Sequence, residues 1–187
     1  MTRHRLALLA AAVAVALPAV LTGASPAAAD ELRNQDLVNR MDGSRLTTSS
    51  TADGTQVYTA RGTARDANVG EAWDFNGTWD PVARLWTATL RTTSGGKCLQ
   101  PIDNTPARGE ALVIRACDDS ALQRWSVREE TKGDDKNRWW VWRPETNLDV
   151  AMSATNIESD YDLLRLDYSY PSSDRLWQLG PNNSPWW

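Results

Sequence analysis

The sequence predicts an all-β domain built from three repeats of about fifty residues, closed into a barrel with pseudo-threefold symmetry. Two observations carry this prediction. Trp73, Trp125 and Trp177 recur at an interval of 52 residues. The residues between them form short alternating runs separated by turn clusters rather than helical stretches. Two units of this size could not close the same ring, whereas three can.

Residues 1–29 are expected to be cleaved from the mature protein. They begin with a basic segment at 3–5, continue through an apolar run at 6–21 and end in three alanines at 27–29, which is the pattern of a secretory signal peptide. The apolar run is short for a membrane-spanning helix, and no second one follows. We therefore expect a secreted, extracellular domain at residues 30–187 with no membrane insertion.

The composition of the remaining chain excludes several functions. Loss of Arg3 and Arg5 leaves 18 of the 20 lysines and arginines against 24 acidic residues, a net charge of −6. A chain this acidic is not expected to bind nucleic acid, because that affinity depends on neutralising phosphates. The single histidine, His4, leaves with the signal peptide, which removes Ser-His-Asp and Cys-His catalysis and imidazole metal sites. We expect no enzyme activity, no metal and no cofactor.

Short strands separated by turns make up each repeat. Residues 112–116 place Leu112, Ile114 and Ala116 on one face and Val113 and Arg115 on the other. Residues 164–168 place Leu164, Leu166 and Tyr168 opposite Arg165 and Asp167, and this period of two indicates half-buried strands. Clusters rich in Gly, Asn, Asp, Pro and Ser separate such runs. These signals place the repeats at about 31–75, 86–128 and 138–180.

Several residues are expected to be structural. The three recurring tryptophans should fill the core rather than bind a ligand, because a large ring repeated once per unit suits a symmetric interior. The same is expected of Leu46, Leu99 and Leu148. Cys98 and Cys117, both in the second repeat, are expected to form a disulfide in an exported protein, with a free reactive thiol as the alternative.

The second repeat carries a family resemblance. It contains Gly96-Lys97-Cys98-Leu99, an apolar strand at 112–114, Cys117, and then Gln123-Arg124-Trp125. This arrangement resembles a ricin B-type lectin repeat, whose pattern is G-K-C-L, a short apolar strand, a second cysteine and Q-x-W. The first and third repeats resemble it more loosely, so the resemblance covers nearly all of residues 31–180. It implies a β-trefoil, a six-stranded barrel capped by three hairpins, with a sugar pocket possible in each repeat.

The resemblance also implies where sugar-binding residues would lie. In the family, a pocket carries an aspartate just after the C-L step, an aromatic ring two residues before the second cysteine and an asparagine just before Q-x-W. The carboxylate and amide bind sugar hydroxyls, and the ring packs against the apolar C–H face of the sugar. In the third repeat these positions hold Asp149, Asp167 and Asp174. Tyr168 is adjacent, but its alternation with Leu166 suggests that it lies in the core.

The second repeat departs from the family pattern at all three positions. Gln100 stands at the aspartate position, Arg115 at the ring and Leu122 at the asparagine. Asp103 is near enough in sequence to supply the carboxylate instead. No repeat has the full galactose triad, so the expected ligand is a polysaccharide or a non-galactose glycan, and the third repeat is the stronger candidate.

Trp140 and Trp142 form a second candidate surface. In a strand these two rings share one face, and only one face can pack on the barrel unless the other is covered. Cover from Trp79 or from Trp186-Trp187 would make them structural. Left exposed, they would mark a binding surface for a polysaccharide or a protein.

The favoured hypothesis is a secreted carbohydrate-binding protein without catalysis, acting through altered pockets. Carboxylate pairs such as Asp118-Asp119 are expected in charged turns, whereas a glycosidase needs two carboxylates facing one bond across a cleft. The alternative is a protein-binding subunit or inhibitor-like module whose sugar sites have been lost. Convergence of Asp149 and Asp174 on one shallow pocket would favour the first hypothesis.

Overall fold

The computed structural model describes residues 29–61, 72–130, 138–155 and 161–181. In this part of the chain every element is a strand apart from the short 3-10 helices η2 (Ala121–Gln123) and η3 (Ser173–Arg175), which confirms the all-β prediction. The predicted signal peptide, up to residue 28, and Trp186-Trp187 lie outside the described residues. No helix within the described ranges is long and apolar enough to cross a membrane.

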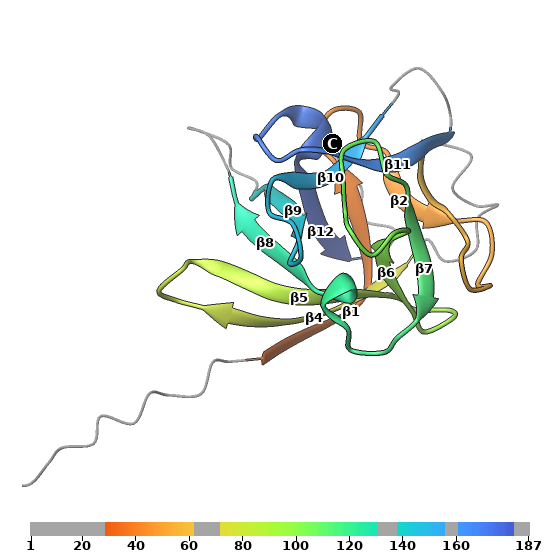
Figure 1. Ribbon diagram of the computed structural model, residues 1–187, viewed down its shortest axis with the longest axis horizontal. Helices are drawn as coiled ribbons and strands as arrows, with labels where there is room; N and C mark the ends of the chain where they lie inside the picture. The colour runs from red at the N-terminus through yellow and green to blue at the C-terminus, as the bar shows by residue number, and fades with distance from the viewer. Residues whose placement is uncertain (1–28, 62–71, 131–137, 156–160, 182–187) are drawn as a thin grey trace, which may run out of the picture.

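Six strands pair in a closed antiparallel ring, and Figure 1 shows how these strands are arranged. They are β1 (Ala29–Asn39), β4 (Trp73–Asp80), β5 (Leu85–Thr92), β8 (Trp125–Glu129), β9 (Trp140–Pro144) and β12 (Trp177–Pro181). Each pairs with the next in this order, and β12 returns to pair with β1. The ring is a barrel, and its closure satisfies the backbone edges that an open sheet would expose.

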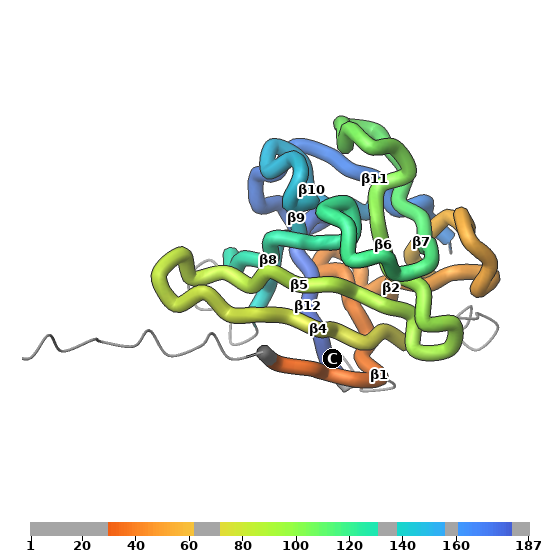
Figure 2. The backbone as a smooth tube through the Cα atoms, turned by 60° about the horizontal axis from the view of Figure 1, so that its bottom comes forward, coloured from red at the N-terminus to blue at the C-terminus, as the bar shows by residue number. Residues whose placement is uncertain are grey.

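Three hairpins connect successive pairs of barrel strands. They are β2 (Arg45–Thr48) with β3 (Val57–Ala60), β6 (Lys97–Pro101) with β7 (Leu112–Ala116), and β10 (Val150–Ala154) with β11 (Tyr161–Tyr168). The hairpins also contact one another, because β3 pairs with β11 and single bridges join residues 56 to 113 and 111 to 165. Figure 2 shows the second and third hairpins above β1, β4 and β5.

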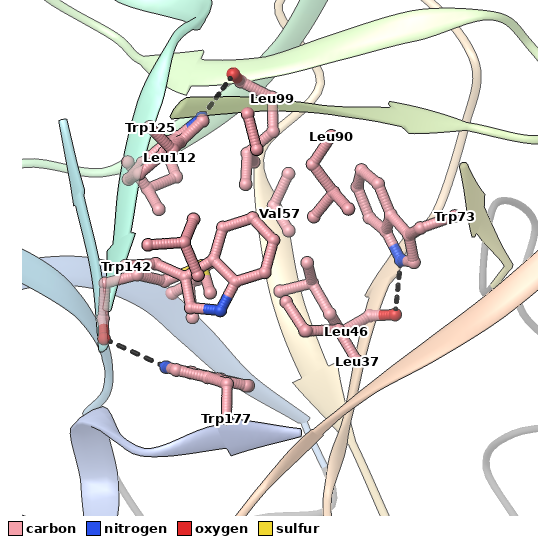
Figure 3. Close-up of a cluster of buried hydrophobic side chains, with 14 of the residues drawn as sticks. Leu37, Leu46, Val57, Trp73, Leu90, Leu99, Leu112, Trp125, Trp142 and Trp177 are labelled. Atoms are coloured by element: carbon pink, nitrogen blue, oxygen red, sulfur yellow. Dashed lines mark hydrogen bonds between the residues drawn. The ribbon is translucent and has the colours of Figure 1, made fainter. Parts of the chain in front are cut away.

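Three tryptophans tie the barrel to the hairpins (Figure 3). Trp73, Trp125 and Trp177 are the first residues of β4, β8 and β12, and each is fully buried. Their indole Nε1 groups donate to the backbone carbonyls of Leu46 (2.9 Å), Leu99 (3.1 Å) and Met152 (3.0 Å), which lie in β2, β6 and β10. Each ring therefore fills the core and also satisfies a hairpin carbonyl.

The third hairpin begins later in the sequence than expected. Leu148 was expected in the core with Leu46 and Leu99, but it is 53% exposed. Met152 is fully buried in its place and accepts the hydrogen bond of Trp177. Residues 145–149 form a turn before β10 that is as long as the turn before β2, so Met152 is the true counterpart of Leu46 and Leu99, and the alignment expected from the sequence was four residues too early.

The burial of Trp142 favours the structural alternative over an exposed patch formed by Trp140 and Trp142. Trp142 is 0% exposed and belongs to the same hydrophobic cluster as the three recurring tryptophans. Trp140 also packs against this cluster, so the two rings share a face as the alternation predicts. Trp140 is only half-buried, however. The shared face points into the barrel. Trp142 is buried because it lies further from the barrel opening than Trp140 does.

The predicted disulfide joins Cys98 and Cys117. Gln123, the glutamine of the Q-x-W motif, fastens the same loop: its Nε2 donates to the Ala116 carbonyl (2.9 Å), and its Oε1 accepts from the Asp118 N–H (2.9 Å). The side chain of Gln123 is buried. Its role in this chain is to hold the end of β7 against the turn at η2.

Candidate functional site

A polar cavity of about 330 Å³ lies beside the third hairpin. Its lining comes from β10, β11, η3 and the loop between β6 and β7, and consists of Arg108, Gly109, Ser153, Ala154, Thr155, Arg165, Leu166, Asp167 and Asp174. Two of the predicted sugar-binding residues, Asp167 and Asp174, therefore meet in one cavity. Its volume is within the range of small-ligand sites.

A segment of the second repeat forms one wall of this cavity. Gly109 donates its N–H to the Leu166 carbonyl (2.7 Å), and Leu166 donates to the Glu110 carbonyl (2.9 Å), so the loop runs alongside β11. This pairing places Arg108 Nε 2.7 Å from Asp167 Oδ1. Arg165 donates to the Gly109 carbonyl at 2.8 Å. No local sequence pattern points to Arg108, since it lies 59 residues from Asp167.

A buried arginine holds both carboxylates in place. Arg175 donates through Nη2 to Asp167 Oδ2 (2.6 Å), and its Nη1 lies 3.1 Å from Asp174 Oδ2. It stands two residues before Trp177, as Gln123 stands before Trp125. The 52-residue offset could have identified Arg175 as the third repeat's counterpart of the Q-x-W glutamine. Its positive charge compensates the two acidic groups beside it.

The two carboxylates differ in their capacity to bind a ligand. Asp174 accepts hydrogen bonds from Ser153 Oγ (2.8 Å), Ser172 Oγ and Arg175, which occupy most of its lone pairs. At Asp167, Oδ1 accepts from Arg108 and from the Tyr168 N–H, while Oδ2 accepts only from Arg175 among the residues that the structure describes. Asp167 thus keeps an acceptor position for a ligand, whereas Asp174 fixes the turn.

The arginines also keep Asp167 ionised. Burial disfavours the charged form, but hydrogen bonds from Arg108 and from the Tyr168 backbone, together with the two guanidinium charges, outweigh it. The pKa of the Asp167 carboxyl is therefore lowered from its usual value. A carboxylate in this state accepts hydrogen bonds and is poorly suited to donate a proton.

Tyr168 lies outside the core, contrary to the expectation from alternation. It is 53% exposed, and Arg108 lies 4.8 Å from its ring centroid. Tyr168 is the last residue of β11, beyond the part of the strand that the core covers. Tyr170 is also exposed, with Arg175 4.3 Å from its ring centroid. The two tyrosines therefore lie against the two arginines that hold Asp167.

Asp149 lies outside the cavity, so Asp149 and Asp174 do not converge. The reason is the displaced alignment: β10 starts at Val150, and Ser153 is the residue that reaches Asp174. Asp149 is an exposed turn residue, whose N–H donates to Asn147 Oδ1 at 3.0 Å. The family's aspartate position is thus taken by Ser153, one residue after Met152.

The candidates in the second repeat do not form a comparable site. Gln100 is buried, and its Oε1 accepts from Gln123 Nε2 at 2.9 Å, so its side chain belongs to the disulfide loop. Arg115 and Asp103 are exposed. The described contacts bring neither of them to Gln100. In the described residues, no group of three or more His, Cys, Asp or Glu side chains could hold a metal ion.

Similarity to known proteins lies in the three-dimensional structure. No family model matches the sequence, and no curated protein matches it significantly. The designed threefold-symmetric protein ThreeFoil matches with a TM-score of 0.60 over 78% of this chain and 96% of its own, at 20% identity. A ricin B-like lectin from Macrolepiota procera in complex with lactose gives 0.54 over 86% of this chain and 99% of its own, at 14% identity.

A cytolethal distending toxin structure from Actinobacillus actinomycetemcomitans gives a TM-score of 0.59 over 81% of this chain and 94% of the toxin chain, at 16% identity. The chain has the β-trefoil fold. The closed barrel and three hairpins agree with this assignment. The resemblance to ricin B-type lectins is therefore confirmed at the level of the fold.

Proposed function

We propose that this β-trefoil is a secreted, non-catalytic carbohydrate-binding protein and that the polar cavity of its third hairpin is the binding site. The observation that carries the proposal is the pair of arginines, Arg108 and Arg175, that hold Asp167 in the cavity with an acceptor position still open. A fixed carboxylate beside guanidinium groups suits sugar hydroxyls, which both donate and accept hydrogen bonds.

The cavity offers mainly hydrogen-bond donors. The hydrogen bonds described above use one N–H group of Arg108 and one of Arg165, and each guanidinium carries five. Tyr168 adds an exposed ring at the edge, against which the C–H face of a sugar can pack. We infer a ligand rich in acceptor oxygens, bound through a different set of groups from the aspartate–asparagine pair of the family pattern.

The absence of catalysis is also part of the proposal. A glycosidase needs one carboxylic acid that stays protonated near neutral pH, which requires a raised pKa. Asp167 has a lowered pKa, and Asp174 is engaged by two serines and Arg175. Neither carboxylate has the environment of a general acid.

The same proposal includes the three-repeat origin of the fold. Its support is the common hydrogen bond of the three recurring tryptophans and the insertion of one hairpin between each pair of barrel strands. The Macrolepiota lectin, solved with lactose, shows that a protein of this fold can bind a sugar. Secretion rests on the signal-peptide pattern of residues 1–29.

The test is binding of the purified protein to a glycan array, followed by calorimetric titration of each hit. Arg165→Ala and Asp167→Asn should weaken binding by at least about tenfold, because a hydrogen bond to a charged group contributes roughly 1.5–3 kcal/mol. Arg115→Ala and Asp149→Asn are matched controls, since both residues are exposed outside the cavity.

Two results would count against this site. Unchanged glycan binding in Arg165→Ala and Asp167→Asn would place the sugar elsewhere. Loss of binding in Asp149→Asn alone would restore the site expected from the sequence. Failure of the wild-type protein to bind any glycan would favour the alternative function, a protein-binding subunit or inhibitor-like module.

A further inference from the structure

A second cavity, of about 430 Å³, opens at one end of the barrel. Each of the six barrel strands contributes to its wall: Leu32, Phe75, Trp86, Val127, Trp140 and Leu179 come from β1, β4, β5, β8, β9 and β12. Phe75, Val127 and Leu179 each lie two residues beyond a tryptophan that bonds to a hairpin. The cavity is therefore the mouth of the barrel, at the end away from the hairpins.

The mouth continues into a groove along the β4–β5 hairpin. A neighbouring cavity of about 400 Å³ shares Trp86, Trp140, Asp30 and Arg138 with the mouth and extends to Trp79. A third cavity, of about 540 Å³, starts from Trp79 and reaches the turn of the hairpin. Figures 1 and 2 both show this hairpin projecting beyond the barrel. We call the three connected cavities the mouth groove.

Aromatic rings form the floor of the mouth groove. Trp79 and Trp86 are a cross-strand pair with ring centroids 5.3 Å apart, and both are half-buried. Phe75 contacts Trp86 edge-on at 5.7 Å and also contacts the buried Trp142 at 6.0 Å. The series of contacting rings therefore runs from the core to the hairpin, which keeps the half-buried rings in fixed positions.

Gly77 allows these rings to lie across the strand. A Cβ atom at this position would stand 2.5 Å from Phe75 Cζ and 3.2 Å from Trp86 Cε3, which are too close for either ring to remain where it is. The absence of a side chain at Gly77 therefore allows Phe75 and Trp86 to occupy their positions in the groove.

We propose that the mouth groove binds a neutral oligosaccharide chain as a second carbohydrate site. This inference rests on the proposed function, which it extends to an extended glycan. A sugar chain needs apolar platforms for its C–H faces and polar groups for its hydroxyls. The mouth groove supplies both, with Trp79, Trp86 and Trp140 as platforms and charged side chains at its margin.

The charges of the mouth groove favour a neutral ligand. Its first two cavities contain two carboxylates, Asp30 and Glu129, and two guanidinium groups, Arg84 and Arg138. Arg128 in the third cavity lies 3.7 Å from Glu130. An anionic polymer would meet the carboxylates, and a purely apolar peptide or lipid would desolvate charged groups without replacing their hydrogen bonds. A neutral sugar avoids both costs.

The experiment is titration of the purified secreted protein with neutral hexasaccharides of glucose, xylose and N-acetylglucosamine, read by calorimetry and by tryptophan fluorescence. Trp79→Ala should weaken hexasaccharide binding about five- to tenfold, as expected for loss of one aromatic contact. Trp79→Phe should retain part of the affinity, because a smaller ring remains. Trp139→Ala is the matched control, since Trp139 is half-buried but lies outside the mouth groove.

The variants separate this inference from the proposed function. Hexasaccharide binding that depends on Trp79 and persists in Arg165→Ala supports the mouth groove whatever the fate of the polar cavity. Glycan binding lost in Arg165→Ala and unchanged in Trp79→Ala overturns the mouth groove and leaves the proposed function standing. Binding of an apolar dye that Trp79→Ala abolishes, with no hexasaccharide bound, also overturns it. Far-ultraviolet circular dichroism establishes that Trp79→Ala is folded.

Discussion

The three tryptophans that tie the barrel to the hairpins should contribute equally to stability. Each of Trp73, Trp125 and Trp177 is fully buried and donates its indole N–H to a hairpin carbonyl over 2.9 to 3.1 Å. Replacement by phenylalanine keeps an aromatic ring but removes the donor. We expect the same loss of unfolding free energy at all three positions, because the environments match.

The size of the loss follows from two contributions. A net hydrogen bond contributes about 1 kcal/mol. The phenylalanine ring is roughly 40 Å³ smaller, and at about 24 cal/mol per Å³ the resulting cavity costs about 1 kcal/mol. Each variant should therefore lose about 2 kcal/mol, which corresponds to a fall in Tm of roughly 4–8 °C for a domain of this size.

Trp142 provides the control within the same core. It is equally buried, but its Nε1 has no hydrogen-bond partner among the described residues. Trp142→Phe also leaves a cavity, yet it removes an unsatisfied buried N–H, so its net cost should be below 1 kcal/mol. Urea and thermal unfolding of the four variants measure these differences. Equal losses in Trp142→Phe and the other three would refute the role of the hydrogen bonds, and unequal losses among the three would refute their equivalence.

Two further predictions concern the disulfide and the dependence of stability on pH. Replacing Cys98 and Cys117 together by alanine should lower the free energy of unfolding in urea by about 3 kcal/mol, since the bond spans 19 residues of sequence; an unchanged midpoint would contradict this. Burial opposes ionisation of Asp74, but hydrogen bonds from a backbone N–H, a threonine and an arginine outweigh it and lower its pKa. Its stabilising contribution is therefore complete above the unfolded-state pKa of about 3.9 and is lost as pH falls through the lower folded-state pKa. Asp74→Asn should weaken the acid dependence of Tm in this range, and an identical pH profile would count against it.

The fold could be predicted from the sequence because its signals are periodic. The spacing of Trp73, Trp125 and Trp177 marks three equivalent points in the core, and the alternation at 112–116 and 164–168 marks hairpin strands. The tryptophan spacing and the alternation at 164–168 both reflect burial, whereas residues 112–114 are buried on both faces of their strand. The cysteine pair followed from its position in one repeat of an expected exported chain.

The candidate site was less predictable because its residues depend on register and on contacts between repeats. The motif-based alignment placed the start of the third hairpin four residues too early, so that Ser153, and not Asp149, is the residue that reaches Asp174. Arg108 belongs to another repeat. Backbone hydrogen bonds between its loop and β11 bring it to the cavity, and no local sequence pattern predicts such a pairing. Alternation correctly predicted that Tyr168 lies on a strand. It could not show that the strand extends beyond the core, which leaves Tyr168 exposed at its end.

The residues of the mouth groove illustrate the same limit. Trp140 and Trp142 share a face, and the periodicity of the strand treats them alike. In the closed barrel Trp142 lies deep in the interior and packs in the core, whereas Trp140 lies at the opening and lines a cavity. Position along the barrel axis depends on all six strands together, which is information that no single strand carries.

The pairing of β1 with β12 has a consequence for how the chain folds. Gln35 pairs with Pro181 and Asn39 with Trp177, so the barrel joins segments from opposite ends of the described chain. Such distant contacts cost loop-closure entropy before they return any stability, and they slow folding. The ring cannot close before β12 is available to pair with both β1 and β9, so closure of the barrel depends on the strand that comes last in the described chain.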